Sequence, residues 1–171
     1  MDKIPNTQRK MARFSAHMTW ILILVMLTYG FNAYIEQRDN PNSQLTLANG
    51  ADQVRLIADR KGQYRAPGAI NGHPVSFVVD TGATYVSLPG SLANELSLPR
   101  QGKSFALTAN GRVAVDLTQL EEVSLGGLSM SNVPAMIVPE LDSQIVLLGM
   151  SFLKHLELQQ SSGQLTIRLP K

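Results

Sequence analysis

The 171-residue sequence contains no cysteine, which excludes disulfide bonds, thiol nucleophiles and cysteine-based zinc sites. Its histidines, His17, His73 and His155, are scattered and lack the spacing of an HExxH-type metal site. A glycine-rich phosphate loop is missing, and Ser131 occupies the final glycine position of the nucleophile-elbow pattern that starts at Gly127. We therefore expect no metal and no cofactor, and we look for chemistry in other side chains.

The sequence also lacks the basic domain surface that binds nucleic acid. The formal net charge is +2, but residues 1–18 alone contribute +3, because four Lys and Arg side chains stand there against Asp2. The rest of the chain therefore carries a net charge of −1. Since nucleic-acid-binding proteins cluster Lys and Arg on the folded domain itself, we expect no nucleic-acid partner.

One stretch near the N-terminus lacks charge altogether. Residues 19–35 are 17 consecutive uncharged residues, with Trp20, Tyr29 and Tyr34 near the ends. A helix of about 17–25 apolar residues can cross a bilayer, and aromatic side chains favour its two interfaces. The excess of positive charge before this stretch predicts a cytoplasmic N-terminus and an extracytoplasmic location for residues 36–171.

This interpretation divides the N-terminal part into a basic cytoplasmic tail (1–18), a transmembrane helix acting as a signal anchor (19–35) and a polar linker (36–52). Two alternatives stay open for the apolar stretch: a cleaved signal peptide and a buried core helix. A small-x-small cleavage site is poor, because Phe31 lies two residues before Ala33. A core helix would leave the flanking charge asymmetry unexplained.

Residues 53–171 show the pattern of a single all-β domain. Asn-Gly pairs at 71–72 and 110–111 stand between apolar runs, and both residues of such a pair accept the positive φ of a hairpin turn. Short helices are predicted at 91–96 and 150–155. Strands are predicted at residues 54–58, 64–70, 73–79, 84–88, 105–109, 112–115, 117–125, 133–138, 145–148, 156–159 and 165–169. Many short strands with frequent turns indicate an all-β domain.

A candidate catalytic motif lies where the apolar strand at 73–79 runs directly into Asp80. Burying an isolated carboxylate is unfavourable, so an acid at the end of such a strand needs a partner or a task. Thr81 offers a hydroxyl to brace the loop, and Gly82 allows a sharp turn. The alternative is an Asp that merely starts a turn. Chance produces Asp-Thr-Gly in roughly a few per cent of chains this long, so the motif needs support from elsewhere.

Further support comes from the order of three elements: Asp-Thr-Gly-Ala after an apolar strand, a hairpin, and an apolar strand ending in Gly149 before a short helix. With this order, residues 62–169 resemble the retropepsin-like aspartic proteases, above all the bacterial branch with one N-terminal membrane segment. The resemblance implies a closed β-barrel and no cofactor. It also suggests a bacterial inner membrane with the domain in the periplasm.

The resemblance carries over residue by residue. It implies Asp80 as the catalytic residue, Thr81, Gly82 and Ala83 as its supporting loop, Thr108, Ala109, Asn110 and Gly111 as a substrate-covering flap, and Leu147, Leu148 and Gly149 as the paired apolar strand. Viral members place an acid after the motif and an Arg after the downstream glycine. Here those positions are Thr84 and Met150, so that ionic brace is absent.

Aspartic proteolysis needs two carboxylates that share one proton, because two like charges about 3 Å apart cannot both ionise easily. The sequence holds only one such motif: Asp116 precedes Leu117, and Asp142 precedes Ser143. We therefore expect a homodimer that hydrolyses peptides or proteins and is attached to a membrane through residues 19–35. The alternatives are a non-catalytic peptide-binding module of the same fold and a structural membrane-tethered domain; the latter explains neither Asp80 nor the hairpin.

Overall fold

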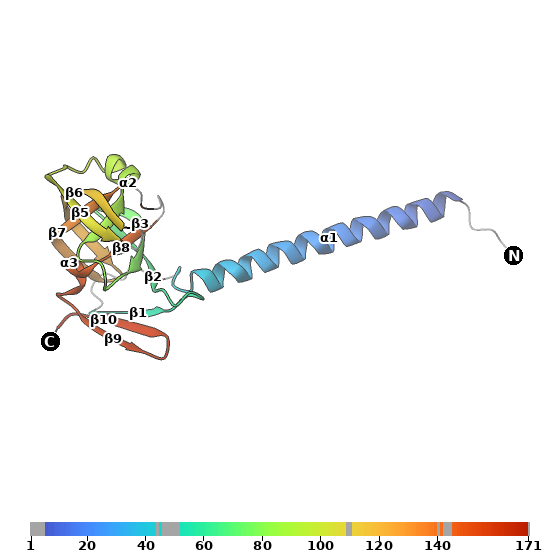
Figure 1. The fold of residues 1–171 in the computed structure, drawn as a ribbon. Coiled ribbons are helices and arrows are strands. Elements are labelled where there is room, and N and C mark those ends of the chain that lie inside the picture. The colour runs from blue at the N-terminus through green and yellow to red at the C-terminus, as the bar shows by residue number, and fades with distance from the viewer. Residues whose placement is uncertain are drawn as a thin grey trace. The chain divides into compact units, whose positions relative to one another are not determined.

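The computed structural model describes residues 6–43, 45, 52–108, 111–139, 141 and 145–170. The chain divides into two compact units, Met1–Asp39 and Asn40–Lys171. The first unit holds helix α1 (Asn6–Asp39), and the second holds the strands and two short helices (Figure 1).

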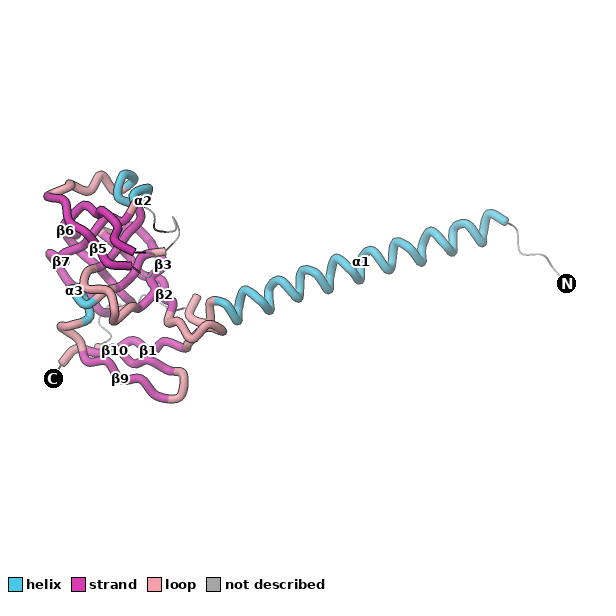
Figure 2. Tube along the Cα trace, in the orientation of Figure 1, coloured by secondary structure: helices cyan, strands magenta, loops and turns pink. Residues whose placement is uncertain are grey.

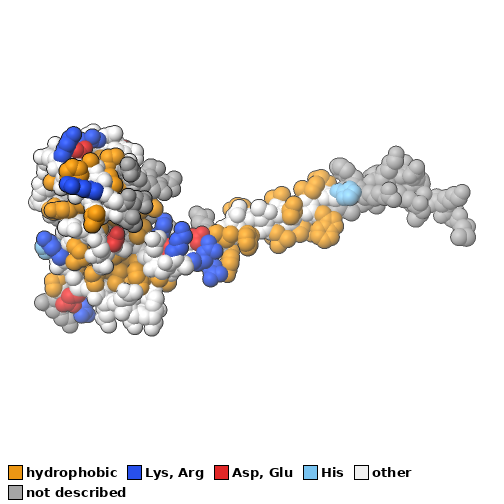
Figure 3. Space-filling model, viewed as in Figure 1, with side chains coloured by type: hydrophobic (Ala, Val, Ile, Leu, Met, Phe, Trp, Pro, Cys, Tyr) orange, Lys and Arg blue, Asp and Glu red, His pale blue; other side chains and the backbone are white. Residues whose placement is uncertain are grey.

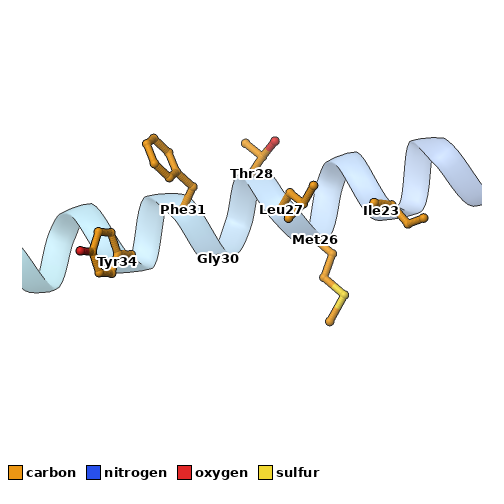
Figure 4. Close-up of a pocket in the computed structure, with 7 residues that line it drawn as sticks. All are labelled: Ile23, Met26, Leu27, Thr28, Gly30, Phe31 and Tyr34. Carbon is orange, nitrogen blue, oxygen red and sulfur yellow. The ribbon is translucent and has the colours of Figure 1, made fainter.

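Helix α1 contains the uncharged stretch 19–35 and extends beyond it on both sides. Apolar side chains are exposed along it, among them Trp20 and Leu24 (Figure 3). A shallow, mostly apolar hollow on the helix surface is lined by Ile23, Met26, Leu27, Thr28, Gly30, Phe31 and Tyr34 (Figure 4). Within the described residues, no helix combines the length and the apolar character that crossing a membrane requires. The helical conformation of 19–35 is thus confirmed, while its predicted membrane crossing is not supported.

The second unit is mostly β, as predicted. Its elements are β1 (Gln53–Ile57), β2 (Arg65–Ile70), β3 (His73–Val79), β4 (Val86–Pro89), α2 (Gly90–Glu95), β5 (Gly102–Thr108), β6 (Gly111–Leu125), β7 (Leu128–Val138), β8 (Val146–Leu148), α3 (Met150–Leu153), β9 (Glu157–Ser161) and β10 (Gln164–Arg168). Buried apolar residues alternate with more exposed ones along β1, β2 and much of β6, so one face of each of these strands packs into a shared core.

Six strands close into a barrel, which confirms the predicted architecture. The large sheet runs β2-β3-β8-β4-β7-β6-β5, and an extra pairing of β2 with β6 joins its two sides. Strand β5 lies outside the ring, paired with β6. The closing seam depends on Gly68, because a Cβ there would lie 2.3 Å from the carbonyl oxygen of Ser124 and 2.5 Å from the Phe77 ring.

The predicted hairpin turns hold where the structure describes them. Asn71 and Gly72 have φ values of 50° and 78°, as a type I′ turn requires. Strands β5 and β6 pair up to Thr108 and Gly111, which confirms the second hairpin, although Ala109 and Asn110 lie outside the described residues.

Two strands predicted at 112–115 and 117–125 are instead one strand, β6. Asp116 does not interrupt it, because its backbone stays in register with Lys103 on β5 and Ile137 on β7. Its carboxylate, 3.3 Å from an Arg100 guanidinium nitrogen, is only partly exposed and is paired. An acidic residue in the sequence therefore does not mark a strand end here.

A small second sheet, in the order β1-β10-β9, lies beside the barrel (Figure 2). It buries Leu56 and Ile167 completely. Asn42, from the predicted linker, joins this unit: its side-chain amide donates to the carbonyl oxygens of Ile57 (2.8 Å) and Arg65 (2.7 Å). Part of the predicted linker at 36–52 is therefore hydrogen-bonded to the β domain.

Candidate functional site

The site is built where β3 and β8 run parallel. Val78 pairs with Leu147 and Val79 with Leu148, so both strands end at the same edge of the barrel. The backbone N–H of Asp80 donates to the carbonyl oxygen of Leu148 at 3.1 Å. The apolar strand predicted to pair with the Asp80 segment therefore lies directly beside it.

The carboxylate of Asp80 is half-buried and folds back onto its own loop. Its Oδ1 accepts a hydrogen bond from the backbone N–H of Gly82 at 2.9 Å. A Cβ on Gly82 would lie only 3.2 Å from that oxygen. Among the described residues, none donates a hydrogen bond to Oδ2 and none forms an ion pair with the carboxylate. One oxygen of Asp80 is thus left for a ligand or a partner.

Helix α3 is hydrogen-bonded to the loop that follows Asp80. The N–H groups of Met150 and Ser151 donate to the carbonyl oxygens of Ala83 (2.8 Å) and Thr84 (2.9 Å). The Ser151 hydroxyl, buried, accepts a hydrogen bond from the N–H of Val86 at 2.9 Å. Because α3 follows β8 immediately, these hydrogen bonds join the apolar strand and the Asp80 loop.

Gly149 makes this contact possible. A Cβ at this position would lie 2.3 Å from the carbonyl oxygen of Tyr85 and 2.7 Å from that of Ala83. No side chain fits into that space without moving the loop. The sequence pattern of an apolar strand ending in glycine therefore has a direct structural reason.

One expectation about the loop, the role of Thr81, needs revision. The Thr81 hydroxyl, predicted to brace the loop, is exposed and forms no hydrogen bond within the described part of the chain. Bracing comes instead from the Gly82 N–H, from the α3 backbone and from Ser151. No local pattern marks Ser151, because its hydrogen-bond partner Val86 lies 65 positions away.

A cavity of about 720 Å³ opens in front of Asp80. The lining is shared between the Asp80 loop, the inner strands and β5: Asp80, Gly82, Ala83, Thr84, Tyr85, Ser87, Phe105, Ala106, Leu107, Thr108, Met136, Val138, Leu141 and Leu147. Phe105 and Leu107 are 60% and 89% exposed, so two apolar side chains of β5 stand uncovered at the cavity. Such exposure on a cavity wall indicates a surface that a ligand covers.

The β5–β6 hairpin is the predicted flap. Thr108 lines the cavity, and its hydroxyl donates to the carbonyl oxygen of Gly111 at 2.9 Å. The Arg112 guanidinium lies 3.9 Å from the Phe105 ring centroid and fixes that ring by a cation–π contact. The predicted flap residues 108–111 do not include Phe105 and Leu107, which also line the cavity. The sequence carries no signal for them, because Ala106 between them is apolar and the local pattern does not show which face of the strand is open.

Within the described ranges, no group of three or more His, Cys, Asp or Glu side chains could hold a metal ion. The chemistry available at the cavity is therefore that of a carboxylate with one open oxygen, a rigid backbone loop and apolar walls.

Comparisons with known proteins point in one direction. The family model described as gag-polyprotein putative aspartyl protease matches residues 66–155. A protein of Sinorhizobium sp. named "Uncharacterized protein in cobV 5'region" is 31% identical over 128 residues, which cover 72% of this chain; the chain spans only 55% of that relative's length.

Two solved structures are similar. The crystal structure of a retropepsin-like aspartic protease from Rickettsia conorii matches with a TM-score of 0.57 and 26% identity, covering 68% of this chain and 98% of the other. The EIAV protease complexed with the inhibitor HBY-793 matches with a TM-score of 0.46 and 19% identity, covering 54% and 86%.

Proposed function

Because the chain belongs to the retropepsin-like aspartyl protease family, we propose that it is an aspartic endopeptidase whose active form is a homodimer. Each copy contributes Asp80 to a pair of catalytic carboxylates. The observation that carries the proposal is the carboxylate of Asp80, which faces a cavity of about 720 Å³ with one oxygen unbonded within the described residues.

The reaction follows from two such carboxylates sharing one proton. The ionised carboxylate takes a proton from a water molecule, and the water oxygen attacks the carbonyl carbon of the scissile peptide bond. The protonated carboxyl gives its proton to the carbonyl oxygen. The C–N bond then breaks: the leaving nitrogen takes the proton that the first carboxylate had accepted, and a hydroxyl of the intermediate returns its proton to the second carboxylate. This forms the carboxyl product and leaves one proton shared by the pair. The rigid loop keeps each carboxylate oriented throughout, which favours reaction.

The second carboxylate comes from another copy, because the sequence holds one Asp-Thr-Gly and Asp80 is the one acid among the described residues that line the cavity. Asp116 is paired with Arg100 and does not line the cavity, and Asp142 lies outside the described residues. Thr81 and Gly82, at the tip of the Asp80 loop, are exposed, so an identical loop can approach them. A two-fold contact at these tips would bring two copies of Asp80 together.

The substrate class follows from the cavity walls. The apolar part of the lining includes Leu147, Met136 and Val138, and also Phe105 and Leu107 of β5. An extended peptide with apolar side chains near the scissile bond would cover this surface, and β5 borders the cavity, where a peptide backbone can run alongside it. Peptides and unfolded segments of proteins are thus the proposed substrates.

The extracytoplasmic location of residues 36–171 stays a prediction from the charge asymmetry of the N-terminal sequence. If it holds, a protease added to intact spheroplasts degrades the domain and spares a cytoplasmic marker. Protection of the domain under the same conditions would place it in the cytoplasm.

The proposed activity is tested by incubating the full chain with a peptide library at acidic and neutral pH, with and without a pepstatin-type inhibitor. Cleavage that the inhibitor blocks, and that Asp80→Asn lacks, supports the proposal. Tight binding of peptides without any cleavage would favour the non-catalytic peptide-binding module instead. The two outcomes separate the two functions on the same samples.

A further inference from the structure

One polar side chain stands out on the floor of the cavity. Ser87 is 4% exposed and lines the cavity beside apolar neighbours. Its strand, β4, pairs with β7 through Met136 and with β8 through Leu147, so these three residues form one row across three adjacent strands. Since Val86 and Leu88 belong to the barrel core, Ser87 is the residue of this part of β4 that faces the cavity.

The Ser87 hydroxyl is poorly satisfied. Its hydrogen bond within the described residues goes to the carbonyl oxygen of Tyr85 at 3.2 Å, longer than the usual range for O–H donors. A hydroxyl also offers two acceptor lone pairs, and neither the Met136 nor the Leu147 side chain has a hydrogen to donate to them. A buried polar group of this kind favours a ligand that completes its hydrogen bonds.

The position of Ser87 ties it to the substrate. Leu147, its neighbour on β8, pairs on its other side with Val78, two residues before Asp80. The hydroxyl therefore lies in the same cavity as the proposed catalytic carboxylate, one strand removed from the strand that carries it. A substrate side chain next to the scissile bond would rest on this row.

We propose that Ser87 is a specificity-determining residue: the subsite above it selects a substrate side chain that hydrogen-bonds to its hydroxyl, with threonine favoured over valine. This inference rests on the proposed peptidase function. Thr and Val have nearly the same shape and differ by a hydroxyl in place of a methyl group, so the choice between them isolates the hydrogen bond from the packing.

The test uses pairs of peptides that differ only by Thr or Val at each position around the scissile bond. We expect one position at which the wild-type full chain prefers Thr in kcat/KM. In Ser87→Val, the Thr-to-Val ratio at that position should fall by about tenfold, because a purely apolar floor no longer rewards the hydroxyl. Ser76→Val, the same change on a strand residue outside the cavity, should leave the ratio as in wild type.

Ser87→Ala guards against a folding failure of the valine variant, because it removes only the hydroxyl; the ratio should fall in the same direction. Binding of the same peptide pairs, followed by fluorescence anisotropy on Asp80→Asn, gives a readout that needs no catalysis. An unchanged ratio in folded Ser87→Ala and Ser87→Val would overturn the role of Ser87. Absence of any cleavage by wild type, with the Thr-over-Val preference still seen in binding, would overturn the peptidase proposal while supporting the subsite.

Discussion

Asp80 owes its proposed role to the carboxylate oxygen that the described residues leave unbonded. The other oxygen is occupied by the Gly82 N–H, which fixes the direction of the group. An asparagine side chain can still accept that hydrogen bond through its amide oxygen, but it cannot take a proton from water. The chemistry and the local structure at this residue are therefore separable.

In Asp80→Asn we expect a loss of peptidase activity of about 1000-fold or more, because a neutral amide cannot act as the general base. The free energy of unfolding should change by less than about 1 kcal/mol. Peptide turnover and thermal unfolding of the same samples check both statements. A variant that cleaves at the wild-type rate would remove Asp80 from the mechanism.

Ser151 is a second single residue on which the site depends, because its hydroxyl stabilises the loop after Asp80 and does not contact the substrate. In Ser151→Ala the buried N–H of Val86 loses its acceptor, so we expect unfolding to become easier by about 1–3 kcal/mol. Denaturant unfolding measures this change. Ser91→Ala, on an exposed serine of α2, is the matched control and should stay within about 0.5 kcal/mol of wild type. Equal stabilities for the two variants would show that the Ser151 hydrogen bond contributes nothing.

At the scale of elements, two glycines permit the contacts between strands on which the site depends. Gly149 lets β8 and α3 approach the Asp80 loop, and Gly68 lets β2 close the barrel against β6. Neither has a left-handed backbone conformation, so glycine is required there because a side chain would not fit, and not because of the φ angle.

We expect Gly149→Ala and Gly68→Ala each to destabilise the domain by about 1–3 kcal/mol or more, because the added methyl group overlaps backbone atoms. Gly149→Ala should also lower activity, since the loop it displaces carries Asp80. Thermal unfolding measures the loss of stability in both variants, and peptide turnover measures the additional loss of activity in Gly149→Ala. Gly102→Ala, where a Cβ meets nothing within 4 Å, is the control and should be close to neutral. Wild-type stability in Gly149→Ala would mean that the loop does not pack as described.

Elements were largely predictable from the sequence, because alternation and Asn-Gly turns are local signals. The barrel, the hairpin at β5–β6 and the parallel partner of the Asp80 strand were all confirmed. The prediction that failed depended on distant contacts: Asp116 stays inside β6 because its backbone pairs with Lys103 on β5 and Ile137 on β7. In the same way, the proposed roles of Ser87 and Ser151 depend on partners that are distant in the sequence or lie on neighbouring strands, and no local pattern reveals these partners.

At the scale of the whole molecule, the proposed enzyme is a pair of chains that shares one proton between two carboxylates. Activity should therefore follow a bell-shaped pH profile. At low pH both carboxyls are protonated and no base is present; at high pH both are ionised and no acid is present. Peptide turnover measured across the pH range, at constant ionic strength, tests this. A profile with a single ionisation would indicate one working carboxylate.

The most direct test of the central claim mixes wild-type chains with Asp80→Asn chains by refolding them together in known proportions. If each active unit needs Asp80 from both copies, activity at equal proportions falls to about one quarter of the wild-type value, because mixed pairs are inactive. Refolded wild type alone, at the same total concentration, is the reference. A fall to only one half, linear in the fraction of wild-type chains, would show that a single chain carries the whole catalytic site.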